Sequence, residues 1–240
     1  MPPQSTSSNL VILTGAGISA ESGLPTFRAS DGLWEGHRVE DVATPGAFAR
    51  QPSLVHQFYN QRRAALATVK PNAAHEALAR LEKEWPGDFL LVTQNVDDLH
   101  DRAGSRKLLH MHGELLSALC TFCSQTSPWN GDMSDESVCP RCQRPGGVRP
   151  DIVWFGEIPY HMQAILSALQ QGGTFIAIGT SGHVYPAAGF VETAASVGAR
   201  TIEVNLAATA ASSAFAERRT GPATEAVPPL VEELLAAVWG

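Results

Sequence analysis

Residues 9–28 read NLVILTGAGISAESGLPTFR, and this stretch decides the fold. It opens on the apolar run LVIL, which is rich in branched side chains and predicts a buried β-strand. The run leads into residues 15–20, GAGISA, which fit the G-x-G-x-x-G/A fingerprint of dinucleotide-binding folds. In that fingerprint Gly15 permits a tight turn, Gly17 lets the backbone approach a pyrophosphate, and Ala20 keeps the following helix close to the sheet.

The segment after the fingerprint departs from an ordinary dinucleotide fold. Gly23 and Pro25 are expected to end the helix after about one turn, and the usual acidic residue about twenty positions on is not evident. A plain tight turn between a strand and a helix is the alternative interpretation of the glycines. We expect a long loop over residues 21–34. The side chains of this loop that could cover a ligand include Thr26, Phe27 and Arg28.

The composition sets broad limits on the class of protein. The chain has 240 residues, of which 44% are hydrophobic, and a formal net charge of −7. These values favour one large domain, or one domain with a small module, and argue against a general nucleic-acid surface. No apolar run approaches the roughly 18 residues that span a bilayer. Residues 1–8 lack the pattern of a secretory signal and are expected to be a disordered tail, so we expect a cytoplasmic protein without a membrane partner.

Strand-like apolar runs alternate with helical patterns along the chain, at residues 10–13, 89–93, 174–178 and 201–204. This alternation predicts an α/β fold, in which a Rossmann-like parallel sheet has helices on both faces. Each run ends in small or polar residues. Because ligands bind beyond the carboxyl ends of such strands, these ends are expected to line one cleft.

Four cysteines form the pattern C-x2-C-x15-C-x2-C at Cys120, Cys123, Cys139 and Cys142. This spacing predicts one structural Zn²⁺, held by four thiolates with no position left for water. The alternative is a pair of redox dithiols. We expect residues 114–147 to form a small zinc-binding module, inserted into a Rossmann-like NAD-binding domain made of residues 9–113 and 148–240. The helical segment 30–70 is expected to belong to the same smaller part.

Five motifs together resemble the sirtuins, the NAD-dependent protein deacylases, and specifically those of bacterial type. They are GAGIS-x-x-SGLPTFR, TQNVDDLH at residues 93–100, the His-Gly pair at 112–113, VRPDIVWFGE at 148–157 and GTSGHVYP at 179–186. The resemblance covers nearly the whole chain. It implies that NAD is a co-substrate bound by Gly15, Ala16, Gly17, Ile18, Ser19, Ala20, Thr26, Phe27, Arg28, Trp34, Gln94, Asn95, Val96, Asp97, Gly179, Thr180, Ser181, Asn205, Leu206, Ala207 and Ala223.

The resemblance also implies a reaction in which NAD is consumed. The acyl oxygen of a modified lysine attacks the ribose carbon that carries nicotinamide, and nicotinamide leaves. His112, whose imidazole can titrate near neutral pH, is expected to be the general base that activates a ribose hydroxyl to take the acyl group. Asn95 is expected to orient the reacting region. A lone histidine is otherwise usually structural, and that is the role expected for His75.

Tyr59 and Arg62 lie three residues apart in a predicted helix, so their side chains share one face. On spacing alone, a solvated helix face is the alternative. In sirtuins that prefer negatively charged acyl groups, such a pair reads the acyl carboxylate, and an alanine corresponding to Ala43 widens the pocket. The resemblance therefore implies a desuccinylase or demalonylase that still accepts acetyl groups. The residues expected to pair with an acylated-lysine protein or peptide are Val153, Trp154, Phe155 and Gly156.

Three other functions remain open at this stage. A plain deacetylase or an ADP-ribosyltransferase would use the same cofactor site, and a non-catalytic NAD-responsive binding module would bind without turnover. A hydride-transfer dehydrogenase is a further, weaker alternative.

Overall fold

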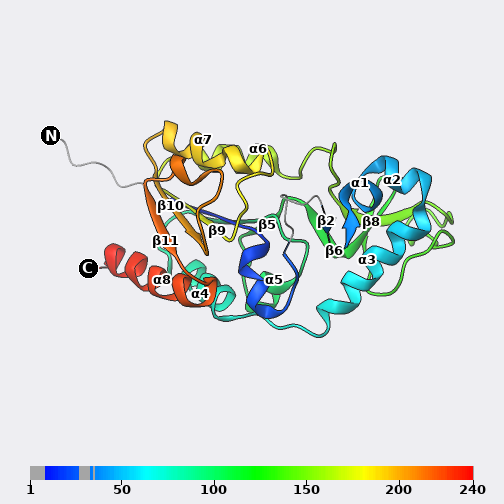
Figure 1. Cartoon of the computed structure of the whole chain (residues 1–240), viewed down its shortest axis with the longest axis horizontal. Coiled ribbons are helices and arrows are strands. Elements are labelled where there is room, and N and C mark those ends of the chain that lie inside the picture. The colour runs from blue at the N-terminus through cyan, green and yellow to red at the C-terminus, as the bar shows by residue number, and fades with distance from the viewer. Residues whose placement is uncertain (1–8, 27–32, 35, 240) are drawn as a thin grey trace.

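The computed structural model describes residues 9–26, 33–34 and 36–239. Figure 1 shows a larger part, which holds both ends of the described residues, beside a smaller part that carries the helices of residues 39–66. The tail expected at residues 1–8 and the expected loop residues Phe27 and Arg28 lie outside the described residues.

The larger part is built on a parallel sheet of six strands in the order β11-β10-β9-β1-β4-β5. Four of them are the predicted strands, and the expected α/β fold is confirmed. Two short strands, β5 and β11, were not predicted. The strands are β1 (Leu10–Thr14), β4 (Phe89–Thr93), β5 (Leu108–His110), β9 (Thr174–Ile178), β10 (Arg200–Asn205) and β11 (Glu217–Thr220).

Alternating side chains of the central strands fill two separate cores. Leu10 and Ile12 of β1 face α4 (Ala73–Glu84) and α8 (Ala223–Trp239). Val11 and Leu13 face α6 (Met162–Leu169) and α7 (Phe190–Ser196). Figure 1 shows these helix pairs on opposite faces of the sheet. Burial on both faces explains why the strands are continuous apolar runs.

The strand at one edge of this sheet is strongly polar. β11 has the sequence ERRT and is largely exposed. Its Glu217 pairs with Arg200 at 2.6 Å, and its Arg219 pairs with Glu233 of α8 at 2.8 Å. A charged edge of this kind discourages pairing with strands of other chains.

The glycine-rich turn after β1 consists of two 3₁₀ turns, η1 (Ala16–Ile18) and η2 (Ala20–Ser22), in place of a regular helix. Its backbone lies directly against the end of β9. Gly17 N–H donates to the carbonyl of Gly179 at 2.9 Å, and a Cβ on Gly17 would lie 2.6 Å from the Cα of Gly179. The sequence motif suggested a pyrophosphate as the reason for this glycine. In the structure, the close approach of the two loops already requires it.

The smaller part contains an antiparallel sheet in the order β7-β6-β8, made of β6 (Gly113–Cys120), β7 (Thr126–Pro128) and β8 (Val148–Ile152). β8 therefore pairs outside the six-stranded sheet, whereas the expected domain boundary put residues 148–152 in the larger domain. The register places Val148 opposite Cys120, so β8 closes the cysteine-bearing segment.

Short helices and a hairpin complete the smaller part. A single apolar cluster joins α3 to β6 and β8 through Tyr59, Leu115 and Ile152. One further helix, α5, follows β4 in the larger part, and 3₁₀ turns η3 (Ala187–Gly189) and η4 (Ser212–Ala214) precede α7 and β11. The elements not yet bounded are α1 (Val39–Val42), α2 (Pro45–Arg50), α3 (Pro52–Leu66), α5 (Leu99–Ala103), β2 (Leu33–Trp34) and β3 (His37–Arg38). A search of the described residues finds no helix with the length and apolar character needed to cross a membrane.

The contact between the glycine loops can be tested by adding one methyl group. Gly179 has φ +61°, and its Cβ would lie 2.5 Å from the Ile18 nitrogen. Gly198 has φ +78° and nothing within 4 Å of its Cβ, so it is a matched control. We expect Gly198→Ala to lower the free energy of unfolding by about 1–2 kcal/mol, and Gly179→Ala by about 2–5 kcal/mol, because overpacking adds to the backbone cost. Urea unfolding measures both, and equal losses would contradict the close contact.

Candidate active site and metal site

A cavity of about 540 Å³ lies where the carboxyl ends of the parallel strands meet the smaller part. Both residues predicted to be catalytic, His112 and Asn95, line it. All seven residues predicted to bind the substrate line it as well, namely Ala43, Tyr59, Arg62, Val153, Trp154, Phe155 and Gly156. The predicted NAD-binding residues on its wall are Gly15, Ala16, Gly17, Ser19, Thr26, Gln94, Asn95, Val96, Asp97, Gly179, Thr180, Ser181, Asn205 and Leu206.

Four other predicted NAD-binding residues are not on this wall: Ile18, Ala20, Ala207 and Ala223. The side chain of Ile18 is fully buried, and it packs with Ala223 in the hydrophobic core under α8. Ala207 is exposed beyond the end of β10. Phe27 and Arg28 lie outside the described residues, as does the side chain of Trp34.

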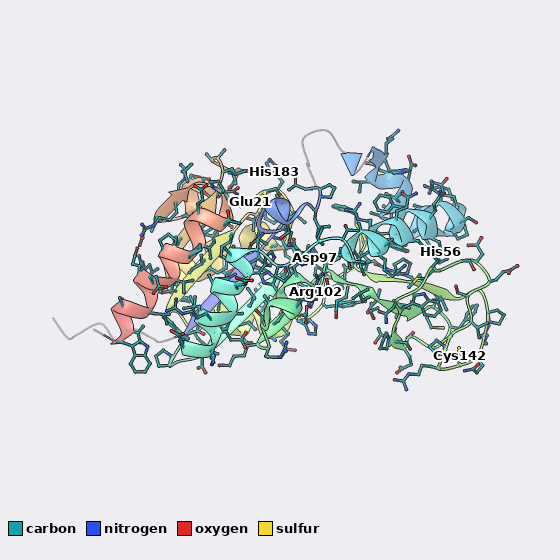
Figure 2. The ribbon with its side chains drawn as sticks, turned by 90° about the horizontal axis from the view of Figure 1, so that it is seen from below. Glu21, His56, Asp97, Arg102, Cys142 and His183 are labelled. Atoms are coloured by element: carbon teal, nitrogen blue, oxygen red, sulfur yellow. The ribbon has the colours of Figure 1, made fainter. Side chains whose placement is uncertain are left out.

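Ser19 is the centre of a buried hydrogen-bond network at the cavity floor. Its hydroxyl donates to Asp97 Oδ2 at 3.0 Å and accepts from Asn95 Nδ2 at 3.1 Å. Asp97 Oδ1 accepts from the N–H of Leu99 at 3.1 Å. Because each partner is buried, these bonds fix the carboxylate and the amide in single orientations. Figure 2 shows Asp97 between the larger and smaller parts.

Burial controls the charge of the titratable groups in this network. It raises the pKa of Asp97, although the N–H of Leu99 and the hydroxyl of Ser19 act in the opposite direction. Burial lowers the pKa of His75 to about 4, so this imidazole is neutral at pH 7. His75 completes the capping box of α4 with Asn72, which agrees with the structural role expected for it.

A second hydrogen-bond network holds the backbone of Asn95. Thr14 Oγ1 donates to Thr93 Oγ1 at 2.9 Å, and Thr93 Oγ1 accepts from the N–H of Asn95 at 3.1 Å. His100 Nε2 lies 3.0 Å from Thr14 Oγ1. No role was expected for His100 or the two threonines, because only the adjacency of β1 and β4 brings them together.

His112 lies in the link between β5 and β6, where the chain passes from one sheet to the other. Its Nδ1 is 3.2 Å from the carbonyl oxygen of Gln94, which can only accept, so Nδ1 carries the hydrogen. Nε2 is then the basic nitrogen. Burial lowers the pKa of His112, with the Gln94 contact acting against it, so the ring is neutral at pH 7 and able to accept a proton. The nearby His110 instead contacts Asp101 at 3.0 Å.

One stretch of the cavity wall is formed by α3, which contributes Tyr59 and Arg62. Tyr59 is fully buried, and its hydroxyl accepts a hydrogen bond from Trp154 Nε1 at 3.0 Å. The guanidinium of Arg62 lies 4.9 Å from the centre of the Phe58 ring. The interpretation of this pair as a solvated helix face is therefore wrong for Tyr59.

Sequence reasoning missed part of the cavity wall. Ala65 lies one helical turn after Arg62, and Leu66 lies two turns after Tyr59. Both line the cavity. That spacing was visible in the sequence and could have identified them. Six further wall residues lie within the quoted motifs but were given no role: Leu24, Pro25, Ile152, Glu157, Val184 and Tyr185. Gln61, Leu115 and Pro159 had no such signal.

The four cysteines gather at the far end of the smaller part, and Figure 2 shows Cys142 there, well away from Asp97. The Sγ atoms of Cys120 and Cys142 are 3.7 Å apart, those of Cys123 and Cys139 are 3.8 Å apart, and all four lie within 4.8 Å of one another. A tetrahedron with Zn–S bonds of about 2.3 Å has edges of about 3.8 Å. The four sulfurs therefore fit a tetrahedral metal ion.

The segment between the two cysteine pairs is fastened to α3. Arg63, which is buried, donates to the carbonyls of Leu115 at 2.8 Å and Gly131 at 3.3 Å. Asn60 accepts from the N–H of Met133 and donates to its carbonyl, both at 2.9 Å. The helix that carries Tyr59 and Arg62 is thus held by the cysteine module.

Comparison with known proteins places this geometry in a family. The model of the Sir2 family matches residues 15–186. A protein of Bdellovibrio bacteriovorus named NAD-dependent protein deacylase is 58% identical over 95% of this chain and 97% of its own length. A protein of the same name from Salmonella typhimurium is 55% identical over 98% of this chain and 87% of its own.

Solved structures agree with these sequence relatives. The crystal structure of a Sir2 homologue in complex with NAD superposes with a TM-score of 0.86 and 38% identity, covering 95% of this chain and 90% of that one. A Sir2 homologue in complex with ADP-ribose superposes with a TM-score of 0.87 and 37% identity, covering 96% and 93%. The fold is thus shared over nearly the full length, and the chain belongs to the Sir2 family.

Proposed function

We propose that this chain is an NAD-dependent protein-lysine deacylase that prefers succinyl and malonyl groups, still accepts acetyl groups, and releases nicotinamide and O-acyl-ADP-ribose. One observation carries this proposal: the same cavity is lined by the basic His112, by Asn95 and the glycine loops, and by the Tyr59–Arg62 pair. The relatives at 55–58% identity named NAD-dependent protein deacylase support the general activity.

NAD, when bound, supplies the ribose carbon that nicotinamide leaves and the hydroxyl that takes the acyl group. The residues of this chain then have separable tasks. His112 accepts a proton at Nε2 from that hydroxyl, because its Nδ1 hydrogen is held by Gln94. Asn95 and Asp97, fixed through Ser19, present an amide and a carboxylate to the nicotinamide side of the site. The buried position of both favours hydrogen bonds that water would otherwise weaken.

Recognition of the acyl group is assigned to the side chains of α3. A guanidinium offers paired N–H donors to a carboxylate, and a phenol adds one O–H donor. Arg62 and Tyr59 both line the cavity, and the small side chain of Ala43 lies on the same wall. Succinyl and malonyl groups end in a carboxylate that could accept these bonds, and an acetyl group does not. This difference supports a preference for dicarboxylic acyl groups over acetyl.

We further propose that the four cysteines hold one structural Zn²⁺. Filling all four tetrahedral positions with thiolates leaves no place for a reacting water. The apolar cluster inside the module is small, consisting of Ala118, Met133 and Val148 with the cysteines, and Trp129 packs against it. Metal binding is therefore expected to supply much of the free energy that folds it.

One experiment separates the proposed activity from its alternatives. The same peptide is incubated in succinyl, acetyl and unmodified forms, with and without NAD, and the products are measured by mass spectrometry. We expect NAD-dependent loss of succinyl at a higher rate than acetyl, with equimolar nicotinamide. ADP-ribosylated peptide would indicate a transferase, and NAD binding without nicotinamide release would indicate a binding module.

Replacing Arg62 tests carboxylate recognition. Arg62→Met is expected to lower kcat/KM for the succinyl peptide about 10- to 150-fold, since a hydrogen bond to a charged group contributes about 1.5–3 kcal/mol. The acetyl peptide, which has no carboxylate, should be affected much less. Arg50→Met makes the same chemical change at an exposed site on α2 and serves as the control. Equal losses for both acyl groups would argue against this recognition.

The pH dependence tests the role of His112. Its pKa is lowered by burial, and the base must be neutral, so activity should rise with pH and reach its plateau with a midpoint below 6.5. His112→Ala is expected to lower kcat by about 10²–10⁴-fold. Profiles of kcat/KM between pH 5 and 9 measure the midpoint. An acidic limb centred above 6.5 would contradict a buried neutral imidazole.

Metal analysis tests the cysteine module. The purified protein should contain one zinc per chain, and Cys142→Ser should lower both the zinc content and the melting temperature. Gln125→Ala changes an exposed side chain of the same module outside the cysteine set, and it should keep the metal. If the metal-free, chelator-treated protein keeps its melting temperature, the cysteine module does not need an ion to stay folded.

A further inference from the structure

Trp154 is a buried tryptophan, and the only polar atom of its side chain, Nε1, bonds to a residue of the proposed acyl-binding pocket. Its side chain is 2% exposed, and its Nε1 hydrogen is donated to the hydroxyl of Tyr59 at 3.0 Å. The sequence placed Trp154 among residues that contact a substrate peptide. In the structure Trp154 lines the cavity, and its indole lies beside Tyr59, with the two ring centres 6.4 Å apart. This position makes it a neighbour of a recognition residue.

We propose that Trp154 is a positioning residue for the choice of acyl group: its indole N–H holds the Tyr59 phenol so that the phenol donates toward a carboxylate on the acyl chain. This inference rests on the proposed function. An indole nitrogen can only donate, so the phenol must be the acceptor in this bond. The phenolic hydrogen is consequently donated in another direction, and Tyr59 shares the cavity with Arg62.

The bond from Trp154 also makes the phenol a better donor. A hydroxyl that accepts one hydrogen bond becomes polarised and donates more strongly in the next. Burial raises the pKa of Tyr59, and the Trp154 bond acts in the opposite direction. The phenol therefore remains protonated at neutral pH, which a donor to a carboxylate requires.

Trp154 is itself held in place by an ion pair behind it. The guanidinium of Arg149 stacks on the indole with its Cζ 3.6 Å from the ring centre. Arg149 forms two hydrogen bonds to the carboxylate of Glu157, at 2.7 and 2.9 Å, and that carboxylate also accepts from the N–H of Trp154 at 2.8 Å. The ring and the backbone of Trp154 are thus fixed by the same pair. A bidentate pair of hydrogen bonds between a guanidinium and a carboxylate restricts the orientation of both groups.

The test compares KM values for succinyl and acetyl forms of one peptide at saturating NAD. Trp154→Phe keeps an aromatic ring and removes the N–H. We expect it to raise the ratio of the succinyl KM to the acetyl KM about three- to tenfold, the effect of losing one hydrogen bond. In a Tyr59→Phe background, the same substitution should leave the ratio unchanged, because the acceptor is already gone. An unchanged ratio in the single variant, or additive effects in the double variant, would overturn the proposal.

Two further variants separate positioning from packing. Phe48→Leu removes the other aromatic ring against Trp154, at 5.4 Å between centres, without touching the N–H. It should lower stability and leave the KM ratio as it is; a ratio that rises as in Trp154→Phe would overturn the proposal. If Trp154→Phe folds poorly, a benzothiophene side chain at position 154 keeps the shape of indole and replaces the N–H by sulfur. That protein should show the same rise in the ratio, and no rise would overturn the proposal.

The outcome is distinguishable from a failure of the proposed function. If Arg62→Met leaves the succinyl preference intact, carboxylate recognition by α3 is wrong, and the role of Trp154 is wrong with it. If Arg62→Met and Tyr59→Phe both lower the preference and Trp154→Phe does not, only the positioning role fails.

Discussion

The active cavity depends on a contact between two stretches of backbone at the carboxyl edge of the sheet. The N–H groups of Gly15 and Gly17 donate to the carbonyls of Ile178 and Gly179, at 3.0 and 2.9 Å. No side chain fits between these loops, so the ends of β1 and β9 meet directly. The floor of the cavity is therefore made of rigid main chain. Ser19, one turn further on, is placed where it can join the residues that follow β4.

Next to this floor, the chain passes from the six-stranded sheet into the antiparallel sheet of the smaller part. His112 lies between β5 and β6, and its carbonyl accepts from the N–H of Val153 at 2.9 Å. Its ring is held by Gln94, at the end of β4. One residue thus contacts both the larger sheet, which carries the glycine loops, and the smaller part, which carries Tyr59. In the proposed reaction, this position puts the base between a cofactor and an acyl group that are held by different parts of the molecule.

Much of this arrangement could be predicted from local patterns, and the rest depends on distant contacts. Apolar runs identified β1, β4, β9 and β10, because strands buried on both faces need apolar side chains throughout. β11 was not predicted, because its sequence ERRT contains no apolar run. The four cysteines could be grouped by spacing alone. The pairing of β8 with β6 could not, since the cysteine module separates the two strands in the sequence and only the tertiary fold brings them together.

The residues of the candidate site divide in the same way, into those that local patterns predict and those that depend on distant contacts. Motifs identified His112, Asn95 and the glycines, and helical spacing put Tyr59 beside Arg62. Nothing in the sequence shows that Trp154 bonds to Tyr59, 95 positions away, or that Ser19 joins Asn95 to Asp97. The resemblance assigned Ile18 and Ala223 to the cofactor, Ala223 through its backbone, and the structure places the side chains of both in the core. Motif position indicates the neighbourhood of a residue, and packing decides which way its side chain faces.

The charged edge strand β11 has a consequence for how copies of this protein behave beside one another. A sheet that ends in an exposed, neutral strand risks pairing with strands of other chains. The six-stranded sheet ends on one side in the arginines of β11 and on the other in only three residues of β5. Neither border offers a long neutral template for a stray chain. The borders of this sheet therefore give little opportunity for self-association at high concentration.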